Sequence, residues 1–353
     1  MPERNWGCRV SLDYTYKGYR LAVLENDLLR VSVLLDKGAD IVEFQHKPSG
    51  TDFLWWTPWG LQRAGRVTLS NALAEGAFGD LYQGGWQEVF PSGGKPNTHQ
   101  GTSFGLHGEV SLQPWEARVI KDTPEEVILE ATVTTYRTPF KLTRRMTLKR
   151  KSAALFIETQ AENLSGEVVE AMWGQHPVFG APFLNENCRV DLPAATCVLD
   201  HGDHPTQRFA KGARGPWPKL KGKDGKMVDL SRFPKPGKPS MDMFYLTDLK
   251  AAWYGLTDTK RKVGLGLAWD KKIWPHLWYW QVYNGFKTAP FWGRTYNCAL
   301  EPFSGWPSGL ADAAKNGTAL RFKGHEIKRG WVTASAFDGK TKVRGVRRDG
   351  TVL

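Results

Sequence analysis

Long apolar runs are missing from this chain of 353 residues. No stretch approaches the roughly 18–20 uninterrupted apolar residues that a membrane-spanning helix needs. The first residues, Met1 to Trp6, also lack the apolar core of a secretion signal. Hydrophobic residues make up 41% and charged residues 24%, as in a soluble globular protein. We therefore expect a cytoplasmic protein with no membrane partner.

Cysteines are few, and the usual cofactor motifs are missing. The four cysteines show no CxxC spacing, and the chain has no HExxH sequence. The Gly-rich stretch 76–94 contains neither GxGxxG after a strand nor a terminal GK[ST], so it does not predict a nucleotide loop. Cys188 and Cys197 could cross-link a hairpin in an oxidising compartment, but free buried thiols are the expectation here. We expect neither a metal nor an organic cofactor.

Long helical periodicity is almost absent, and apolar residues alternate at period two instead. This alternation predicts antiparallel strands that bury one face against a second sheet. The predicted class is therefore all-β, a large antiparallel β-sandwich, in a single domain over residues 1–353. The clearest predicted strands are 19–24, 29–34, 41–44, 127–133, 142–148, 155–159, 263–269, 277–283, 318–322 and 331–335.

The net charge of +12 is concentrated in two segments. Residues 208–238 contain ten Lys or Arg and two Asp, and residues 340–349 contain five Lys or Arg and one Asp. Both are rich in Gly or Pro, as solvated loops are, so we expect a basic surface excursion at about 208–240 that could cover a cleft. The tryptophans near the Gly-rich and candidate catalytic stretches occupy other segments, which argues against a nucleic-acid partner.

Three ionisable residues stand out because Gly, Pro and aromatic residues surround them: His107, His176 and Glu301. Two imidazoles and a carboxylate can move protons on a neutral substrate, one group taking a proton while another gives one. Each also has a structural interpretation: either histidine could fill the core, and Glu301 could pair with an arginine such as Arg294. His107, Glu109 and His176 could also form a metal site, although Gly108 makes the needed strand geometry uncertain.

The 16 tryptophans are many for this length. Most must belong to the core, but a few lining a cleft would bind sugars, because aromatic faces stack on the C–H faces of sugar rings. We expect Trp86, Trp278 and Trp280 to contact the substrate, and also Gln175, the neighbour of His176.

The same stretches resemble the aldose 1-epimerase (galactose mutarotase-like) superfamily. The matching motifs, in chain order, are Leu106-His107-Gly108, His176-Pro177-Val178-Phe179, Asp242-Met243-Phe244-Tyr245 and Leu300-Glu301-Pro302. Val178 after Pro177 and Met243 after Asp242 depart from the usual pattern, which indicates a divergent branch. The early arginine of the superfamily has no clear match, and Arg63 and Arg66 are the candidates.

The resemblance implies a β-sandwich enzyme that interconverts sugar anomers. Glu301 would be the general base, His176 the general acid and His107 a donor to the ring oxygen, while Asp242 and Arg63 would hold sugar hydroxyls. One alternative is another sugar isomerase or lyase on this scaffold, with or without the assistance of a metal ion. Another is a non-catalytic carbohydrate-binding protein. The basic excursion leaves an anionic sugar open as the substrate, and the sequence does not indicate an oligomeric state.

Overall fold

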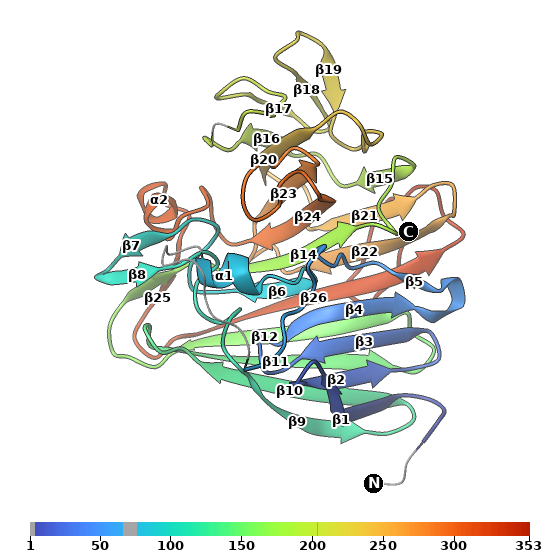
Figure 1. The fold of residues 1–353 in the computed structure, drawn as a ribbon. Coiled ribbons are helices and arrows are strands. Elements are labelled where there is room, and N and C mark those ends of the chain that lie inside the picture. The colour runs from blue at the N-terminus through green and yellow to red at the C-terminus, as the bar shows by residue number, and fades with distance from the viewer. Residues whose placement is uncertain (1–3, 66–75, 203) are drawn as a thin grey trace.

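Two large antiparallel β-sheets form most of this computed structural model, which describes residues 4–65, 76–202 and 204–353 (Figure 1). The first sheet contains, in spatial order, β1 (Arg9–Tyr16), β2 (Tyr19–Glu25), β3 (Leu29–Leu34), β4 (Asp40–His46), β6 (Trp86–Val89), β14 (Gly174–Gly180), β24 (Tyr296–Phe303), β23 (His276–Tyr283), β20 (Ser240–Thr247), β16 (Thr196–Leu199) and β17 (Arg214–Pro216), with β5 (Thr51–Asp52) paired to β4. Its central strands come from distant parts of the sequence, and this brings the segments that carry His176 and Glu301 next to each other.

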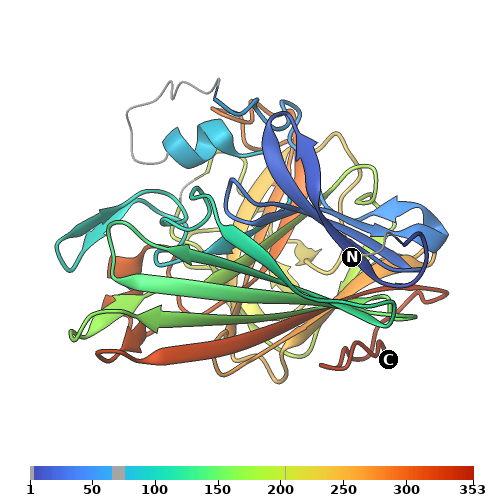
Figure 2. The same cartoon turned by 90° about the horizontal axis from the view of Figure 1, so that it is seen from below.

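The second sheet packs against the first. Its spatial order is β15 (Cys188–Asp191), β21 (Trp253–Asp258), β22 (Val263–Trp269), β26 (Ile327–Asp338), β12 (Ala154–Asn163), β11 (Phe140–Lys149), β10 (Glu126–Thr134) and β9 (Glu116–Asp122). Figure 2 shows the two sheets as separate layers, seen from below. One core cluster takes apolar residues from both sheets, so the period-two alternation buries the facing sides, as the sequence predicted. The predicted all-β sandwich is confirmed.

Short elements lie around these sheets. They are the pairs β7 (Asn97–His99) with β8 (Thr102–Phe104), β13 (Val169–Ala171) with β25 (Leu320–Phe322) and β18 (Lys219–Lys221) with β19 (Met227–Asp229), and the helices η1 (Lys47–Ser49), α1 (Gly76–Leu81) and α2 (Leu310–Lys315). Among the described residues, no helix is long and apolar enough to span a membrane. Cys8, Cys188, Cys197 and Cys298 are all buried as free thiols.

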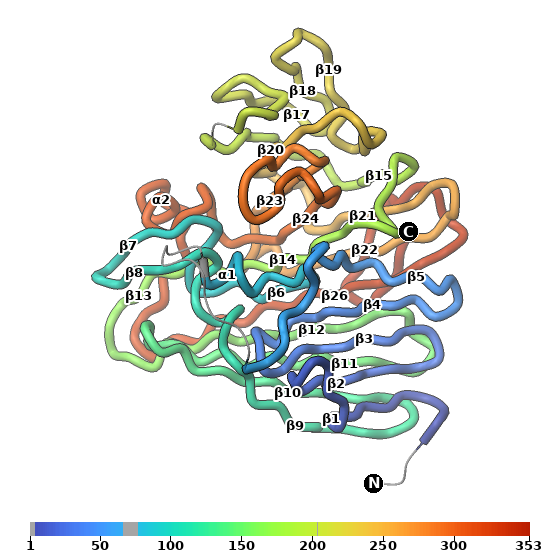
Figure 3. Tube along the Cα trace, in the orientation of Figure 1, coloured from blue at the N-terminus to red at the C-terminus, as the bar shows by residue number. Residues whose placement is uncertain are grey.

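The basic excursion at about 208–240 carries β17, β18 and β19 and lies at one end of the molecule (Figures 1 and 3). It is tied to the first sheet, because Phe209, Leu230 and Phe233 are buried in the common core. The Tyr279 hydroxyl also donates a hydrogen bond of 3.2 Å to the carbonyl oxygen of Leu230. The segment is therefore anchored by apolar residues, while its lysines and arginines are mostly exposed.

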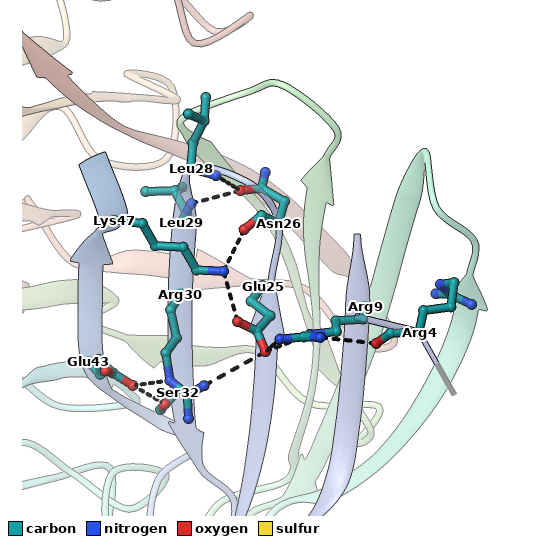
Figure 4. A network of polar contacts seen from close by, with 10 residues as sticks. All are labelled: Arg4, Arg9, Glu25, Asn26, Leu28, Leu29, Arg30, Ser32, Glu43 and Lys47. Carbon is teal, nitrogen blue, oxygen red and sulfur yellow. Dashed lines mark hydrogen bonds and ion pairs between the residues drawn. The ribbon is translucent and has the colours of Figure 1, made fainter. Parts of the chain in front are cut away.

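An ion-pair network joins the first strands of the chain at the other end (Figure 4). The Glu25 carboxylate, on β2, accepts hydrogen bonds from Arg9 Nε at 2.7 Å and from Lys47 Nζ at 2.8 Å. A third cation, Arg30, lies 3.7 Å from the same carboxylate. Burial alone would raise the pKa of Glu25, but the bonds from Arg9 and Lys47 lower it below its usual value. This carboxylate links β1, β2, β3 and the start of η1.

Candidate active site

The centre of the first sheet places three polar side chains in one row across neighbouring strands. Gln87 on β6 is the register partner of His176 on β14. The pairs Gly174–Phe303 and Val178–Ala299 bracket His176 and Glu301, so these two residues occupy opposite positions on β14 and β24. Side chains at opposite positions of antiparallel strands lie on the same face. Gln87, His176 and Glu301 therefore point to one side of the sheet, and Trp278, the register partner of Glu301, extends the row.

His107 reaches this row from the loop after β8. Its backbone has φ of 62°, in the left-handed region, and its N–H donates a 2.8 Å hydrogen bond to the carbonyl oxygen of Gly93. The next residue must be glycine, because a Cβ at Gly108 would lie 2.6 Å from the carbonyl oxygen of Phe90. This tight loop holds the His107 ring 4.8 Å from the His176 ring, centroid to centroid.

A cavity of about 530 Å³ opens over these groups. Its described lining includes the three candidate catalytic residues and two of the three expected tryptophans, Trp278 and Trp280. The other lining residues are Phe78, Gly79, Asp80, Tyr82, Gly94, Lys95, Leu106, His204, Met241, Met243, Phe286, Ala289, Pro290, Phe291 and Ser308. The size and the mixture of aromatic walls with a few polar groups are those of a small-molecule site.

Burial controls the charge of the groups in this cavity. It raises the pKa of Glu301 well above the usual carboxyl value and lowers the pKa of His176 to about 4. The pKa of His107 is lowered well below 6.5, first by burial and then by the neighbouring His176. Nε2 of His176 lies 3.8 Å from Oε1 of Glu301, which is too long for a hydrogen bond but close enough for the protonation of each to depend on the other.

Several buried polar atoms at this cavity have no hydrogen-bond partner within the part of the chain that the structure describes. They are Oε2 of Glu301, Nδ1 of His107, the Tyr82 hydroxyl and Oγ of Ser308. Leaving a buried donor or acceptor unpaired costs about 1–3 kcal/mol, so such atoms are rare in folded proteins. Their gathering around one cavity indicates a site built for a polar ligand.

A comparison with protein families matches residues 16–335 to one described as a domain of unknown function, DUF4432. The chain belongs to this family. No curated protein matches the chain by sequence. Solved structures show the same fold at low sequence identity.

Three of these solved structures cover nearly all of this DUF4432 chain. A Klebsiella pneumoniae protein described as a "putative aldose 1-epimerase" has a TM-score of 0.69 and 13% identity, over 94% of this chain and 83% of its own. A galactose mutarotase-like protein of Clostridium acetobutylicum has a TM-score of 0.63 and 12% identity, over 94% and 99% of the two chains. A galactose mutarotase related enzyme of Lactobacillus acidophilus has a TM-score of 0.57 and 15% identity, over 92% and 99%. This DUF4432 member therefore has the galactose mutarotase-like fold that its motifs resemble.

Trp86 and Gln175 lie on the opposite face of the first sheet from the cavity. Each precedes a residue of the polar row, and neighbouring side chains on a strand point to opposite faces. Trp86 Nε1 donates to Oε1 of Gln175 at 2.9 Å, and Gln175 Nε2 donates to the buried Glu88 at 2.8 Å. Glu88 in turn lies 3.7 Å from Nε of Arg144 on the second sheet. The structure therefore does not support the expectation that Trp86 and Gln175 contact substrate, because both side chains belong to this interior network.

Asp242 also points away from the cavity. Because side chains alternate along β20, Met241 and Met243 face the cavity. The Asp242 carboxylate instead accepts hydrogen bonds from Nε of Arg208 at 2.6 Å and from the backbone N–H of Arg208 at 3.0 Å. Arg63 is exposed and does not line the cavity, and Arg66 lies outside the described residues. Neither Asp242 nor Arg63 is among the described residues that line the cavity, so this arrangement does not support the expected contacts with sugar hydroxyls.

The structure also shows the partners of two carboxylates for which other roles were considered, Glu109 as a metal ligand and Glu301 as an ion-pair partner of Arg294. The Glu109 carboxylate accepts hydrogen bonds from the backbone of Tyr136 and Arg137 and from the Thr138 hydroxyl, so it holds a turn. Arg294 donates to backbone carbonyl oxygens at Pro290 and Phe291. The ionisable neighbour of Glu301 among the described residues is instead His176.

Sequence reasoning missed Gln87, Tyr82 and the aromatic wall formed by Phe78 and Phe291. Gln87 could have been found from the strand pattern, because it stands one residue after Trp86 in a buried strand where a polar residue needs a partner. Tyr82 comes just before the glycine pair at 84–85 and carried no distinguishing signal. Phe291 reaches the cavity from a loop, where no periodicity predicts orientation.

Proposed function

We propose that this protein is an aldose 1-epimerase, which interconverts the α and β anomers of a free aldose or sugar derivative. The single observation that carries the proposal is the opposite placement of Glu301 and His176 across β14 and β24, at the base of an aromatic-lined cavity. A buried carboxylate and a buried imidazole with coupled protonation form a base and an acid within reach of one sugar ring. The fold of the solved structures described above supports the same chemistry by analogy.

In the proposed reaction, the Glu301 carboxylate takes the proton of the anomeric hydroxyl while the His176 imidazolium gives its proton to the ring oxygen. The bond between C1 and the ring oxygen breaks, and C1 becomes an aldehyde carbon. Rotation about the C1–C2 bond exposes the other face of the carbonyl group. The ring then closes as the ring hydroxyl returns its proton to His176 and Glu301 returns its proton to the oxygen on C1.

The remaining cavity groups position the sugar. His107 has a lowered pKa and acts as a neutral hydrogen-bonding group near the ring oxygen. Trp280, which is partly exposed and 6.3 Å from His176 between ring centroids, offers a face on which the C–H side of the sugar can stack. The indole N–H of Trp278 is already bonded to the carbonyl oxygen of Gly305 at 2.9 Å, so this residue contributes its ring rather than its donor.

The test is the rate of anomer interconversion by the purified protein and by Glu301→Gln. Fresh α-anomers of neutral and acidic aldoses are followed by polarimetry and by NMR of the anomeric protons. We expect acceleration over the buffer rate for at least one aldose, and a loss of about 10²–10⁴-fold in kcat for the variant, the range for removal of a positioned acid or base. A protein that binds an aldose without accelerating its interconversion would instead be a binding protein, and the proposal would be wrong.

A further inference from the structure

The side-chain amide of Gln87 can adopt only one orientation. Its Nε2 donates to Oδ2 of Asp40 at 3.1 Å and to the carbonyl oxygen of Gly84 at 2.7 Å. Both partners are acceptors, since Asp40 forms a buried ion pair of 2.8 Å with Lys37. A flipped amide would point its oxygen at a carboxylate and a carbonyl group and would lose both bonds. Oε1 of Gln87 must therefore face His176.

This orientation determines the tautomer of His176. Nδ1 of His176 lies 3.2 Å from Oε1 of Gln87, and an amide oxygen can only accept a hydrogen bond. Nδ1 therefore carries a hydrogen. In the neutral ring the lone pair is then on Nε2, the nitrogen 3.8 Å from Glu301.

We propose that Gln87, held by Asp40, is a positioning residue that fixes His176 as the Nδ1–H tautomer, so that Nε2 is the atom that receives and gives the catalytic proton. One proton is then shared between Nε2 and the Glu301 carboxylate. The catalytic consequence rests on the proposed function, but the tautomer does not. With the proton on His176 the pair is ready to open a sugar ring, and with the proton on Glu301 it is ready to close one.

The other side chains around His176 do not determine its tautomer. The titratable groups that face or adjoin it are Glu301, His107 and Tyr82, with Asp40 behind Gln87. His107 and Tyr82 contact the imidazole through their rings, and no hydrogen bond to His176 from either is present in the described structure. The imidazole also has a hydrogen bond to the backbone of His176 itself, which raises its pKa, so Gln87 is the side chain that distinguishes Nδ1 from Nε2.

Gln83 offers a matched control. Its Nε2 donates to the same Asp40 oxygen at 2.8 Å, it is fully buried like Gln87, and no hydrogen bond joins it to His176 in the described part of the chain. Gln87→Met and Gln83→Met each remove one donor to Oδ2 of Asp40 with a side chain of similar length, and Gln87→Met also removes the donor to the carbonyl oxygen of Gly84. Only Gln87→Met removes the acceptor for His176.

The tautomer is read by NMR of protein with ¹⁵N-labelled histidine, with His176→Gln used to assign the signals of that ring. Two-bond couplings from the ring protons distinguish Nδ1–H from Nε2–H without any substrate. We expect Nδ1–H in the wild-type protein and in Gln83→Met, and a mixture or the Nε2–H form in Gln87→Met. An Nε2–H ring in the wild-type protein, which requires no variant to fold, would overturn the proposal, as would equal spectra for the two methionine variants.

Activity provides the second readout. With the best aldose of the panel, we expect Gln87→Met to lower kcat about 10–100-fold, the range seen when a group that orients a metal-binding imidazole is lost, with KM changed less than about threefold. Gln83→Met should change kcat by less than about threefold. If the wild type is inactive on every aldose but shows the Nδ1–H signal, the proposed function fails and the tautomer assignment stands. If activity is present but both variants lose it equally, the positioning role of Gln87 is wrong.

Discussion

Nε2 of His176 and Oε1 of Glu301 lie 3.8 Å apart at opposite positions of two antiparallel strands, and both side chains are almost fully buried. Burial opposes charge on each group alone, yet two opposite charges at this separation stabilise each other. The neutral pair and the ion pair therefore hold the same single proton. An epimerase needs both forms, because ring opening converts one into the other.

This shared proton predicts a bell-shaped dependence of kcat/KM on pH. At low pH both groups are protonated and no base remains; at high pH both are deprotonated and no acid remains. Burial lowers the pKa of His176 to about 4 and raises the pKa of Glu301 well above 4.5. The doubly protonated pair therefore forms only in acid, and the pair loses its last proton at a pH well above 4.5. We expect a plateau between these limits, measured by initial rates of anomer interconversion at constant ionic strength. A single rising limb at the usual pKa of histidine would contradict the shared proton.

His107 allows the backbone and chemical roles of one residue to be separated. Asparagine tolerates the left-handed conformation, whereas valine at φ of 62° should cost about 1–2 kcal/mol. We expect His107→Asn to keep the unfolding temperature and to lower kcat about 10–100-fold, because the donor to the ring oxygen is lost. His107→Val should lower both the rate and the unfolding temperature. Wild-type kcat in His107→Asn would show that the imidazole takes no part in the reaction.

The network around Glu25 predicts a pH-dependent contribution to stability. Burial raises the pKa of this carboxyl group, but the bonds from Arg9 and Lys47 outweigh it and lower the pKa below 4.5. A lowered pKa stabilises the folded state above the unfolded pKa, and that contribution is lost as pH falls through the folded value. Glu25→Gln should cost about 2–3 kcal/mol in free energy of unfolding at pH 7, and less below pH of about 4.

Urea unfolding at both pH values provides the measurement, with Glu158→Gln as the control. Glu158 pairs with Arg348, but the two side chains are 65% and 61% exposed, so this pair should contribute less than about 0.5 kcal/mol. Equal losses in the two variants would contradict the argument from burial.

The sequence predicts the sandwich well because alternation is a local property. Leu142, Met146 and Leu148 on β11 face the core as period two requires, and Arg144 breaks the apolar row because it meets Glu88 on the facing sheet. The prediction that His107, His176 and Glu301 form one site rested on the order of the motifs along the chain. The placement of His176 and Glu301 side by side depends on β14 and β24 becoming neighbours, and His107 joins them from the loop after β8; no local pattern fixes either arrangement.

The remaining site residues were harder to predict because face assignment depends on register. Trp86 and Gln175 were selected for being next to site residues, but a shift of one residue on a strand moves a side chain to the opposite face. The same rule, applied to His176, would have pointed to Gln87 once β6 was known to pair with β14. Loop residues such as Phe291 follow neither period, so only the folded chain places them.

Asp242 provides a test between a contact to sugar hydroxyls and a contact to Arg208. Its carboxylate is fully buried and bound to Arg208, whose own side chain is 21% exposed. Breaking a buried pair leaves an uncompensated charge, so Asp242→Asn should lower the free energy of unfolding by about 3 kcal/mol, and Arg208→Met should lower it comparably. Under conditions where the variants stay folded, KM for the best aldose should change less than about threefold. A KM raised tenfold or more in Asp242→Asn, with stability retained, would show that the carboxylate leaves Arg208 to hold the sugar, as its sequence motif first suggested.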